Sequence, residues 1–368
     1  MKTKIFLITA LISSFLTSFA HAEWSFEANG EANALYGYSN ISGKYKKFQK
    51  NNNIVTDGWI SFSASNNFYD QYELNILANF LGGTDKYLKD YNQGSWGEEL
   101  YAKIDTPYGQ FSAGQMNNIA YLQSISAPTA GALSVNNSNI TNFIHNPNWI
   151  RRKKTTSFRT LNSTYINTDG TSAKISYLSP EFYNTSIGFS YVPYVYNKTG
   201  LVNKHASYHN NGGIILSAAN HLEFDYVDIE TSLGYAEFFE NDKEYSAGIS
   251  FYRKGFTFGT SYRATEKNNK KYSSVQHFAL PEYFDSYRNG RAFNIGLGYE
   301  IGPFKTAVTY FNSKAKHLRF EDKIVQFSNE YRIHKNVSLY MAVAHVEFKE
   351  EKDAAKGYAF IFGTGINF

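Results

Sequence analysis

The last stretch of the chain, Gly357 to Phe368, reads GYAFIFGTGINF and decides the fold. Successive side chains of a strand point to opposite faces. One face would be apolar and mostly aromatic, with Tyr358, Phe360, Phe362, Ile366 and Phe368. The other would be mostly small, with Ala359, Ile361, Gly363, Gly365 and Asn367. A strand at the end of a chain has an unpaired edge unless another strand covers it. We therefore predict that the first strand of the mature chain pairs with this one and that the sheet closes into a ring.

Residues 1–22 are expected to be a secretory signal peptide rather than part of the fold. Two lysines precede an apolar run from Ile5 to Phe19, and Ala20-His21-Ala22 then places small residues at the positions read for cleavage. The run is short for a membrane-spanning helix, which needs about 20 apolar residues. We therefore expect cleavage before Glu23 and a single domain over residues 23–368.

The composition excludes several classes of protein. The chain of 368 residues holds 30 Tyr, 30 Phe, 7 Pro and no Cys, and its formal net charge is +4. The lack of Cys excludes disulfides and thiolate metal sites, and the small net charge does not favour nucleic-acid binding. Mean hydropathy is −0.43, and no apolar run long enough for a spanning helix follows residue 22. A transmembrane β-barrel fits these features, because only every second residue of its strands needs to be apolar.

The first mature stretch shows the alternation that a barrel requires. Its apolar face would carry Phe26, Ala28, Gly30, Ala32, Ala34, Tyr36 and Tyr38. Its other face would carry Glu27, Asn29, Glu31, Asn33 and Leu35. A soluble sandwich also alternates, but the length of the stretch and its aromatic ends favour a barrel. Similar segments recur to a total of roughly 16, with short turns alternating with long polar loops. Two points stay open: Val337–Phe348 is apolar on both faces, and Thr155–Ile166 is either strand or loop.

Four segments carry a resemblance to a known family. IDTPYGQFSAGQ (Ile104–Gln115) resembles the porin hairpin that turns at a Gly and returns as a G-x-x-x-x-G-[RQ] segment before the constriction loop. AKISYLSPEF (Ala173–Phe182) and IGFSYVP (Ile187–Pro193) are similar to the segment that follows that loop. The terminal strand ending in Phe368 resembles the one that the barrel-assembly machinery reads. The chain thus resembles the general porins of Gram-negative outer membranes, above all the alphaproteobacterial type.

This resemblance implies an all-β fold, a closed antiparallel transmembrane barrel of about 16 strands whose third long loop folds into the lumen. It implies a general diffusion porin: a passive, water-filled channel for small hydrophilic solutes and ions in the outer membrane, which the chain crosses many times. It also implies a homotrimer, with outer-membrane lipid, lipopolysaccharide and the assembly machinery as further partners. No cofactor, metal or nucleic acid is implied.

The constriction loop would lie between Asn117 and about Thr171, and it departs from the family pattern. Family members usually carry carboxylates here, whereas this chain has no Asp or Glu between Gln115 and Thr168. The candidates for the constriction are instead basic: Arg151, Arg152, Lys153, Lys154 and Arg159. The alternative is that the run 151–154 is a solvated segment on the rim that contacts anionic lipopolysaccharide.

The candidates for the lumen wall are mostly acidic. They are Glu27, Glu31, Glu73, Glu99, Tyr101, Lys103 and Arg263. A basic loop opposite an acidic wall would reverse the usual transverse field, and would make the channel less cation-selective than relatives with acidic loops. The alternative is that these carboxylates only hydrate the wall of the lumen and do not set ion selectivity. Tyr101 and Trp59 share the predicted inner face, where they would act as sugar platforms; the alternative is a role in a girdle or a core.

Other functions are weakly supported. A solute-specific porin with a binding track is the nearest alternative. A barrel hydrolase would need a Ser and a His that meet at the rim, but the nine His residues form no H-E-x-x-H arrangement and no G-x-S-x-G elbow is present. A structural or adhesive barrel would need a lumen filled by side chains, and the Gly- and Ser-rich inner faces argue against filling.

Overall fold

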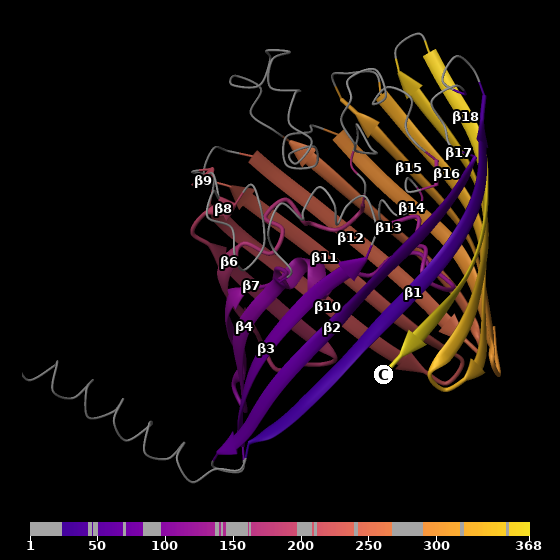
Figure 1. Ribbon diagram of the computed structural model, residues 1–368. Helices are drawn as coiled ribbons and strands as arrows, with labels where there is room; N and C mark the ends of the chain where they lie inside the picture. The colour runs from indigo at the N-terminus through magenta and orange to yellow at the C-terminus, as the bar shows by residue number, and fades with distance from the viewer. Residues whose placement is uncertain are drawn as a thin grey trace, which may run out of the picture.

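The computed structural model describes residues 24–42, 46, 51–68, 71–83, 97–136, 140, 143–144, 161, 163–196, 208–209, 212–238, 242–266, 290–316, 320–350 and 353–368. Within these residues, 16 strands form one closed antiparallel barrel (Figure 1), which confirms the predicted all-β barrel of about 16 strands. Around the ring they are β1 (Ser25–Ile41), β18 (Asp353–Asn367), β17 (Val337–Glu350), β16 (Phe320–His334), β15 (Phe304–Ala315), β14 (Gly290–Ile301), β13 (Phe256–Glu266), β12 (Asp242–Arg253), β11 (Val227–Phe238), β10 (Gly213–Phe224), β7 (Thr185–Val192), β6 (Ala173–Leu178), β5 (Gly109–Gln115), β4 (Gly97–Thr106), β3 (Tyr72–Gly83) and β2 (Asn52–Phe68).

Two smaller elements lie outside the ring order. β8 (Val195–Tyr196) and β9 (Tyr208–His209) form a separate two-stranded sheet, and α3 (Ile119–Leu122) is a short helix after β5. In the part of the chain that the structure describes, no helix is both long and apolar enough to cross a membrane.

The ring closes between the first and the last strand, as the sequence predicts. β1 pairs with β18 in an antiparallel register that places Tyr38 opposite Phe360. At the lower end of this seam, the amide of Gly30 donates to the carbonyl of Phe368 at 2.9 Å, and the amide of Phe368 donates back at 3.0 Å. The C-terminal residue therefore forms part of the ladder that closes the barrel.

Substitution of Gly30 by Val is expected to weaken this closure. A Cβ at position 30 would lie 2.6 Å from Cζ of Phe368 and 2.7 Å from the carbonyl oxygen of Trp59. Overpacking of this kind costs about 1–3 kcal/mol. We expect the folded barrel to convert to the unfolded form at a lower temperature on heat-modifiability gels. Ala32→Val, on the exposed outer face of the same strand, is the control, and equal behaviour of the two variants would contradict the prediction.

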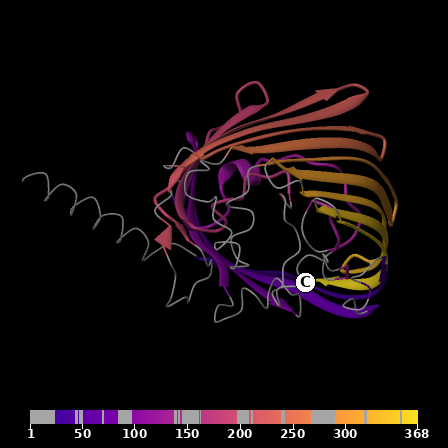
Figure 2. The same ribbon diagram turned by 90° about the horizontal axis from the view of Figure 1, so that it is seen from above.

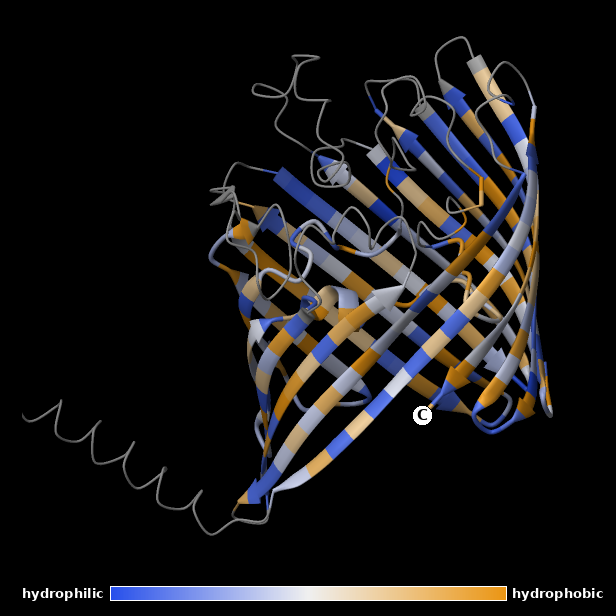
Figure 3. Cartoon of the chain, viewed as in Figure 1, coloured by the Kyte–Doolittle hydropathy of each residue, from blue (hydrophilic) through white to orange (hydrophobic). Residues whose placement is uncertain are grey.

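The two faces of the barrel differ in the way that the alternation predicts. Along β1, Tyr36 and Tyr38 are 46 % and 42 % exposed, whereas Leu35 and Ser39, which flank them in the sequence, are buried. Figure 3 shows hydrophilic and hydrophobic residues alternating along many strands. The outer face is thus apolar over the middle of the barrel, and the inner face carries small and polar residues together with two buried apolar clusters, the larger of which includes β17.

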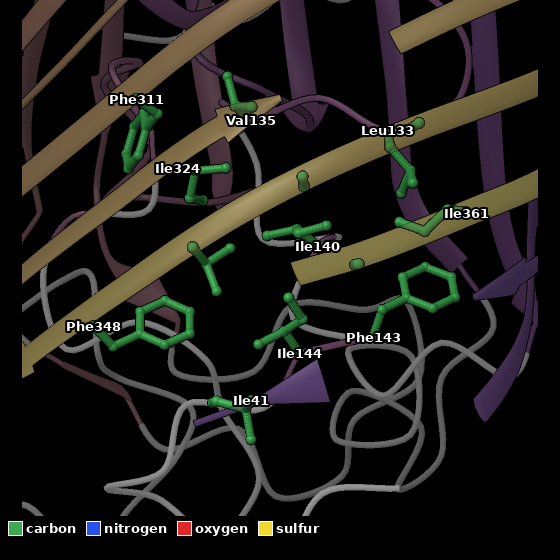
Figure 4. Close-up of a cluster of buried hydrophobic side chains, with 14 of the residues drawn as sticks. Ile41, Leu133, Val135, Ile140, Phe143, Ile144, Phe311, Ile324, Phe348 and Ile361 are labelled. Atoms are coloured by element: carbon green, nitrogen blue, oxygen red, sulfur yellow. The ribbon is translucent and has the colours of Figure 1, made fainter. Parts of the chain in front are cut away.

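The larger cluster explains why both faces of β17 are hydrophobic. Its inner residues Ala342, Ala344, Val346 and Phe348 are buried in a cluster with residues of the segment between β5 and β6 (Figure 4). We call this cluster the apolar loop contact. Its loop residues are Leu133, Val135, Ile140, Phe143, Ile144 and Leu161. Its wall residues are Leu35, Ile41, Val55, Ala292, Phe311, Ile324, Ala342, Ala344, Val346, Phe348, Ala355, Ala359 and Ile361.

The segment Thr155–Ile166, open as strand or loop, is only partly described. Leu161 and residues 163–166 form no strand. The other residues of this segment lie outside the described part of the chain.

Candidate functional site

The segment that follows β5 runs along the inner face of the barrel wall. Its backbone amides bond to wall side chains in the order of the ring: Ile119 to Ser190 Oγ at 3.1 Å, Ile125 to Ser232 Oγ at 3.0 Å, Ala127 to Asn294 Oδ1 at 3.1 Å and Ala130 to Ser328 Oγ at 3.3 Å. Gln326 Nε2 then donates to the carbonyl of Leu133 at 2.6 Å. The anchors lie on β7, β11, β14 and β16, and Figure 2 shows the magenta segment inside the ring of strands.

Glycines on the inner face provide the room for this path. A Cβ at Gly259 would lie 2.6 Å from the carbonyl oxygen of Ser126, and one at Gly248 would collide with the carbonyl oxygen of Ile125. Glycine is therefore required where the two backbones approach closely. The small inner residues, interpreted from the sequence as an open wall, here accommodate the loop.

A buried ion pair joins the two ends of the loop. Lys174 Nζ lies 2.9 Å from Asp169 Oδ2, and both side chains are 0 % exposed. Lys174 also donates to the carbonyls of Met116 and Gly170. Asn118, whose Oδ1 caps α3, donates from Nδ2 to Asp169 Oδ1 at 2.6 Å. The residues that leave β5 and those that enter β6 are thus held at one point.

A second buried ion pair holds the returning part of the loop against the wall. Arg263 on β13 lies 2.8 Å from Glu244 Oε2 on β12, and both side chains are 0 % exposed. Arg263 also donates to Asn167 Oδ1 at 2.7 Å and to Thr168 Oγ1 at 3.1 Å, while Thr168 donates to Glu244. Arg263 therefore faces inward, as the sequence predicts, but its guanidinium is enclosed between wall and loop.

Glu99 contacts the loop in the same way. It accepts bonds from Asn79 Nδ2 at 2.5 Å, from the amide of Asn117 at 2.8 Å and from Asn117 Nδ2 at 2.9 Å. A carboxylate of the wall thereby fixes the first residue of the predicted constriction loop.

The remaining wall candidates also lie on the inner face. By strand register these are Glu27, Glu31, Glu73, Tyr101 and Lys103. Lys103 pairs with Asp105 at 3.1 Å, and Glu31 accepts a bond from Asn33 at 2.6 Å. That these side chains set permeation stays a prediction. The constriction candidates Arg151, Arg152, Lys153, Lys154 and Arg159 lie outside the described residues.

Trp59 lies opposite Glu31, and Tyr101 lies opposite Leu77, so both aromatic residues point inward. An aromatic girdle belongs to the outer face of a barrel, so the register excludes the girdle alternative for these two residues. Trp59 is 40 % exposed, and it presents its ring to the interior of the barrel.

Sequence reasoning missed Glu244, Asp169 and Lys174. The available signal was modest: Asp169 is the first carboxylate after the acid-free stretch, and Lys174 occupies an inner position of a strand. No pattern in the sequence indicates that Lys174 pairs with Asp169 or that Glu244 pairs with Arg263. Across the described ranges, no group of three or more His, Asp and Glu side chains is placed to hold a metal ion.

A closed barrel with an apolar outer surface, a mostly polar interior and a loop along its inner wall defines a transmembrane β-barrel channel. A family model described as Gram-negative porin matches residues 8–351, and the chain belongs to this family. It is accordingly an outer-membrane porin channel whose strands cross the membrane many times.

Individual relatives are distant. An uncharacterized protein of Rickettsia bellii (strain RML369-C) is 25 % identical over 138 residues, which are 35 % of this chain and 29 % of that protein. Among solved structures, Salmonella typhi OmpF in complex with daunomycin has a TM-score of 0.60 at 14 % identity, over 93 % of this chain and 97 % of the other. A mutant of Rh. blastica porin has a TM-score of 0.54 at 9 % identity, over 94 % and 100 %. A loop L8 deletion mutant of OmpT, an outer membrane protein of Vibrio cholerae, has a TM-score of 0.56 at 10 % identity, over 94 % and 99 %. At these identities the structures are similar in fold.

Proposed function

We propose that the chain is a general diffusion porin, in which the loop between β5 and β6 narrows a passive, water-filled channel for small hydrophilic solutes and ions. The observation that carries this proposal is the uneven packing of the inner wall. The loop covers inner residues from β7 round to β18 and β1 and reaches Val55 of β2, whereas other inner residues of β2, β3 and β4, such as Ser61, Asn79 and Lys103, stay partly exposed. The aqueous path runs along these partly exposed strands.

The charges on the inner wall of the barrel are mainly negative. Among the described inner residues that are outside the two buried ion pairs, carboxylates outnumber basic groups; they include Glu27, Glu31, Asp57, Glu73, Glu99, Asp105, Asp228, Glu230 and Glu330. We propose that the basic residues 151–154 and Arg159, which lie outside the described part of the chain, form the other side of the constriction. A basic loop opposite these carboxylates would produce a transverse field of the reversed sense, which would orient dipolar solutes and bias ion permeation.

Neutralising the two sides of the channel is expected to shift ion selectivity in opposite directions. In planar bilayers under a salt gradient, changing Arg151, Arg152, Lys153 and Lys154 to Gln should move the reversal potential toward cation preference. Changing Glu27, Glu31 and Glu73 to Gln should move it toward anion preference. Each change in permeability ratio is expected to be about several-fold, because low-dielectric walls strengthen the field.

Lys254→Gln, in an exposed turn between β12 and β13, is the control and should leave the reversal potential unchanged. If the variant of residues 151–154 leaves the reversal potential unchanged, we would conclude that this run lies on the rim of the barrel and not at the constriction. Folded, heat-modifiable protein that never conducts would refute the channel proposal itself.

We further propose that the protein is a homotrimer and that residues 1–22 are removed on export. Family membership supports the trimer, and the same recordings test it, because a trimer of open channels conducts in steps of three. A passive channel of this kind needs no catalytic group.

A solute-specific porin is the second candidate, and the inward ring of Trp59 favours it. Aromatic faces stack on the apolar faces of sugars, which would slow a sugar in transit. Millisecond current interruptions on addition of an oligosaccharide, absent in Trp59→Ala, would support a binding track. Uninterrupted current would support general diffusion.

A further inference from the structure

A water-facing indole ring lies beside a carboxylate on the inner face of β1 and β2. Trp59 on β2 is 40 % exposed and lies directly opposite Glu31 on β1. The Cβ atoms of opposite residues in an antiparallel pair are about 5 Å apart. Glu31 is half-buried and lies on the same inner face. An aromatic face and a negative charge therefore border the lumen together.

Asn33, on the same face of β1, adds a hydrogen-bond acceptor to this charge. The residue is 8 % exposed, and its amide donates from Nδ2 to Glu31 Oε1 at 2.6 Å. Its Oδ1 is buried and accepts no hydrogen bond from any described residue. A buried acceptor without a donor is unfavourable. Because this acceptor lies next to a carboxylate, a donor that carries a positive charge would satisfy both groups.

Tyr340 on β17 reaches into the same area across β18. A Cβ at Gly365 of β18 would collide with the hydroxyl of Tyr340 and would lie 2.5 Å from Asn33 Oδ1. Gly131 of the loop, with φ +75°, lies against the ring, because a Cβ there would be 2.8 Å from Cδ1. The ring is thus held by wall and loop, and its hydroxyl ends beside Asn33. We call Glu31, Asn33, Trp59 and Tyr340 the acidic aromatic site.

The neighbouring inner residues make the potential at this site more negative. Asp57 lies opposite Asn33 on β2, and Glu330 lies on β16, opposite the tyrosine of the site. The described basic residues in the same register rows are Arg332 on β16 and Lys305 on β15. Both lie beyond β17 as seen from β2, so the side of the site that carries the indole ring is the more negative one.

The loop presents an uncharged, partly apolar surface to the same lumen. Leu122 of α3 is 60 % exposed, and the rings of Tyr121 and Tyr165 lie 5.2 Å apart, edge to face. α3 packs against β7, β10 and β11, and β11 is eight places from β1 in the ring of 16 strands. The described residues between 117 and 168 include no charged side chain. A solute that passes between the two surfaces thus meets a negative, aromatic side and an apolar side.

We propose that the acidic aromatic site binds the primary ammonium group of a small amphipathic amine in transit. The ammonium group has three N–H donors, which suit the carboxylate of Glu31 and Oδ1 of Asn33. The ring of Trp59 attracts the cation and packs against the apolar body of the solute. This inference rests on the proposed channel function and names a class of solute that the channel retains during passage.

The test measures binding to the full-length barrel in uncharged, deuterated detergent by saturation-transfer-difference NMR at neutral pH. The probe is 2-phenylethylammonium, and 2-phenylethanol and 3-phenylpropionate are its neutral and anionic counterparts of similar shape. The amine should bind more tightly than the alcohol, and the acid should not bind. The attraction between two unit charges about 4 Å apart in water is equivalent to about a fivefold factor in affinity. We therefore expect Glu31→Gln to weaken binding of the amine by about fivefold or more.

Substitution of the indole ring tests the aromatic part of the site. Trp59→Leu should weaken binding of the amine by about two- to fivefold, because an exposed cation–π contact has that strength. Trp59→Phe, which keeps an aromatic face, should retain most of the binding. Glu181→Gln, an equal loss of charge at an exposed position between β6 and β7, is the matched control and should bind as the unaltered protein does.

Three results would overturn the inference. They are equal binding of the amine and the alcohol, unaltered binding of the amine by folded Glu31→Gln, and preferential binding of maltose over the amine. The last result would favour a sugar track instead. A barrel that conducts in bilayers but does not bind the amine would refute this site alone. A barrel that binds the amine but never conducts would refute the channel proposal and leave the site in place.

Discussion

Replacement of Arg263 by Ala is expected to release the returning part of the loop and to raise single-channel conductance. The substitution leaves the Glu244 carboxylate in a fully buried position without its partner, and it removes the bonds to Asn167 and Thr168. Breaking a buried ion pair by removing one partner costs about 3–5 kcal/mol. The barrel strands keep their own ladders, so the loop is the element that moves. We expect larger and noisier open-channel currents.

A double substitution distinguishes the effect of leaving Glu244 buried without a partner from the effect of losing the ion pair as a whole. Arg263→Met combined with Glu244→Leu removes both charges, and such replacements are often close to neutral in stability. This double variant should recover most of the unfolding temperature that Arg263→Ala loses. Arg253→Ala, at the exposed end of β12, is the control. Wild-type conductance and unfolding temperature in Arg263→Ala would show that the ion pair does not hold the loop.

Replacement of Phe143 by Ala is expected to detach the far end of the loop from the apolar loop contact. The side chain is 1 % exposed, its ring lies over Gly37, and its carbonyl accepts a bond from Ser39 Oγ at 2.6 Å. A buried Phe→Ala change costs about 3–5 kcal/mol. We expect frequent conductance fluctuations and faster protease cleavage within the loop, while the heat-modifiable gel shift of the barrel stays the same.

Two further variants make this result specific. Tyr108→Ala changes a side chain that is 74 % exposed in a turn, and should leave both readouts unchanged. Gly37→Leu adds a side chain where the ring of Phe143 lies, and should reproduce the Phe143→Ala behaviour from the wall side. Steady current in both Phe143→Ala and Gly37→Leu would show that the contact does not position the loop.

The barrel itself could be predicted because the alternation of inward and outward residues is a local pattern in the sequence. Alternation along Phe26–Tyr38 and Tyr358–Phe368 assigns each residue to a face without knowledge of any partner, and the unpaired last strand implies closure. The orientation of Val337–Phe348 could not be predicted in this way. Its inner face is apolar because loop residues such as Ile140 and Phe143, distant in sequence, cover it.

The contacts that hold the loop could not be predicted for the same reason. The pairs Lys174–Asp169 and Arg263–Glu244 depend on strand register and on the path of the loop, and neither is encoded in a local pattern. Glycine and serine on the inner wall were interpreted as signs of an open lumen. They instead allow the loop backbone to lie against the wall, as Gly248 and Gly259 show.

The distribution of the loop's anchors has a mechanical consequence. Ser190, Ser232, Asn294 and Ser328 hold one continuous segment at points spread around the circumference. Lateral compression by the bilayer tends to flatten a ring of strands toward an oval. Flattening would change the spacing of these four points, which an inextensible backbone resists. We therefore expect the loop to act as an internal brace that keeps the bore of the channel constant when membrane tension changes.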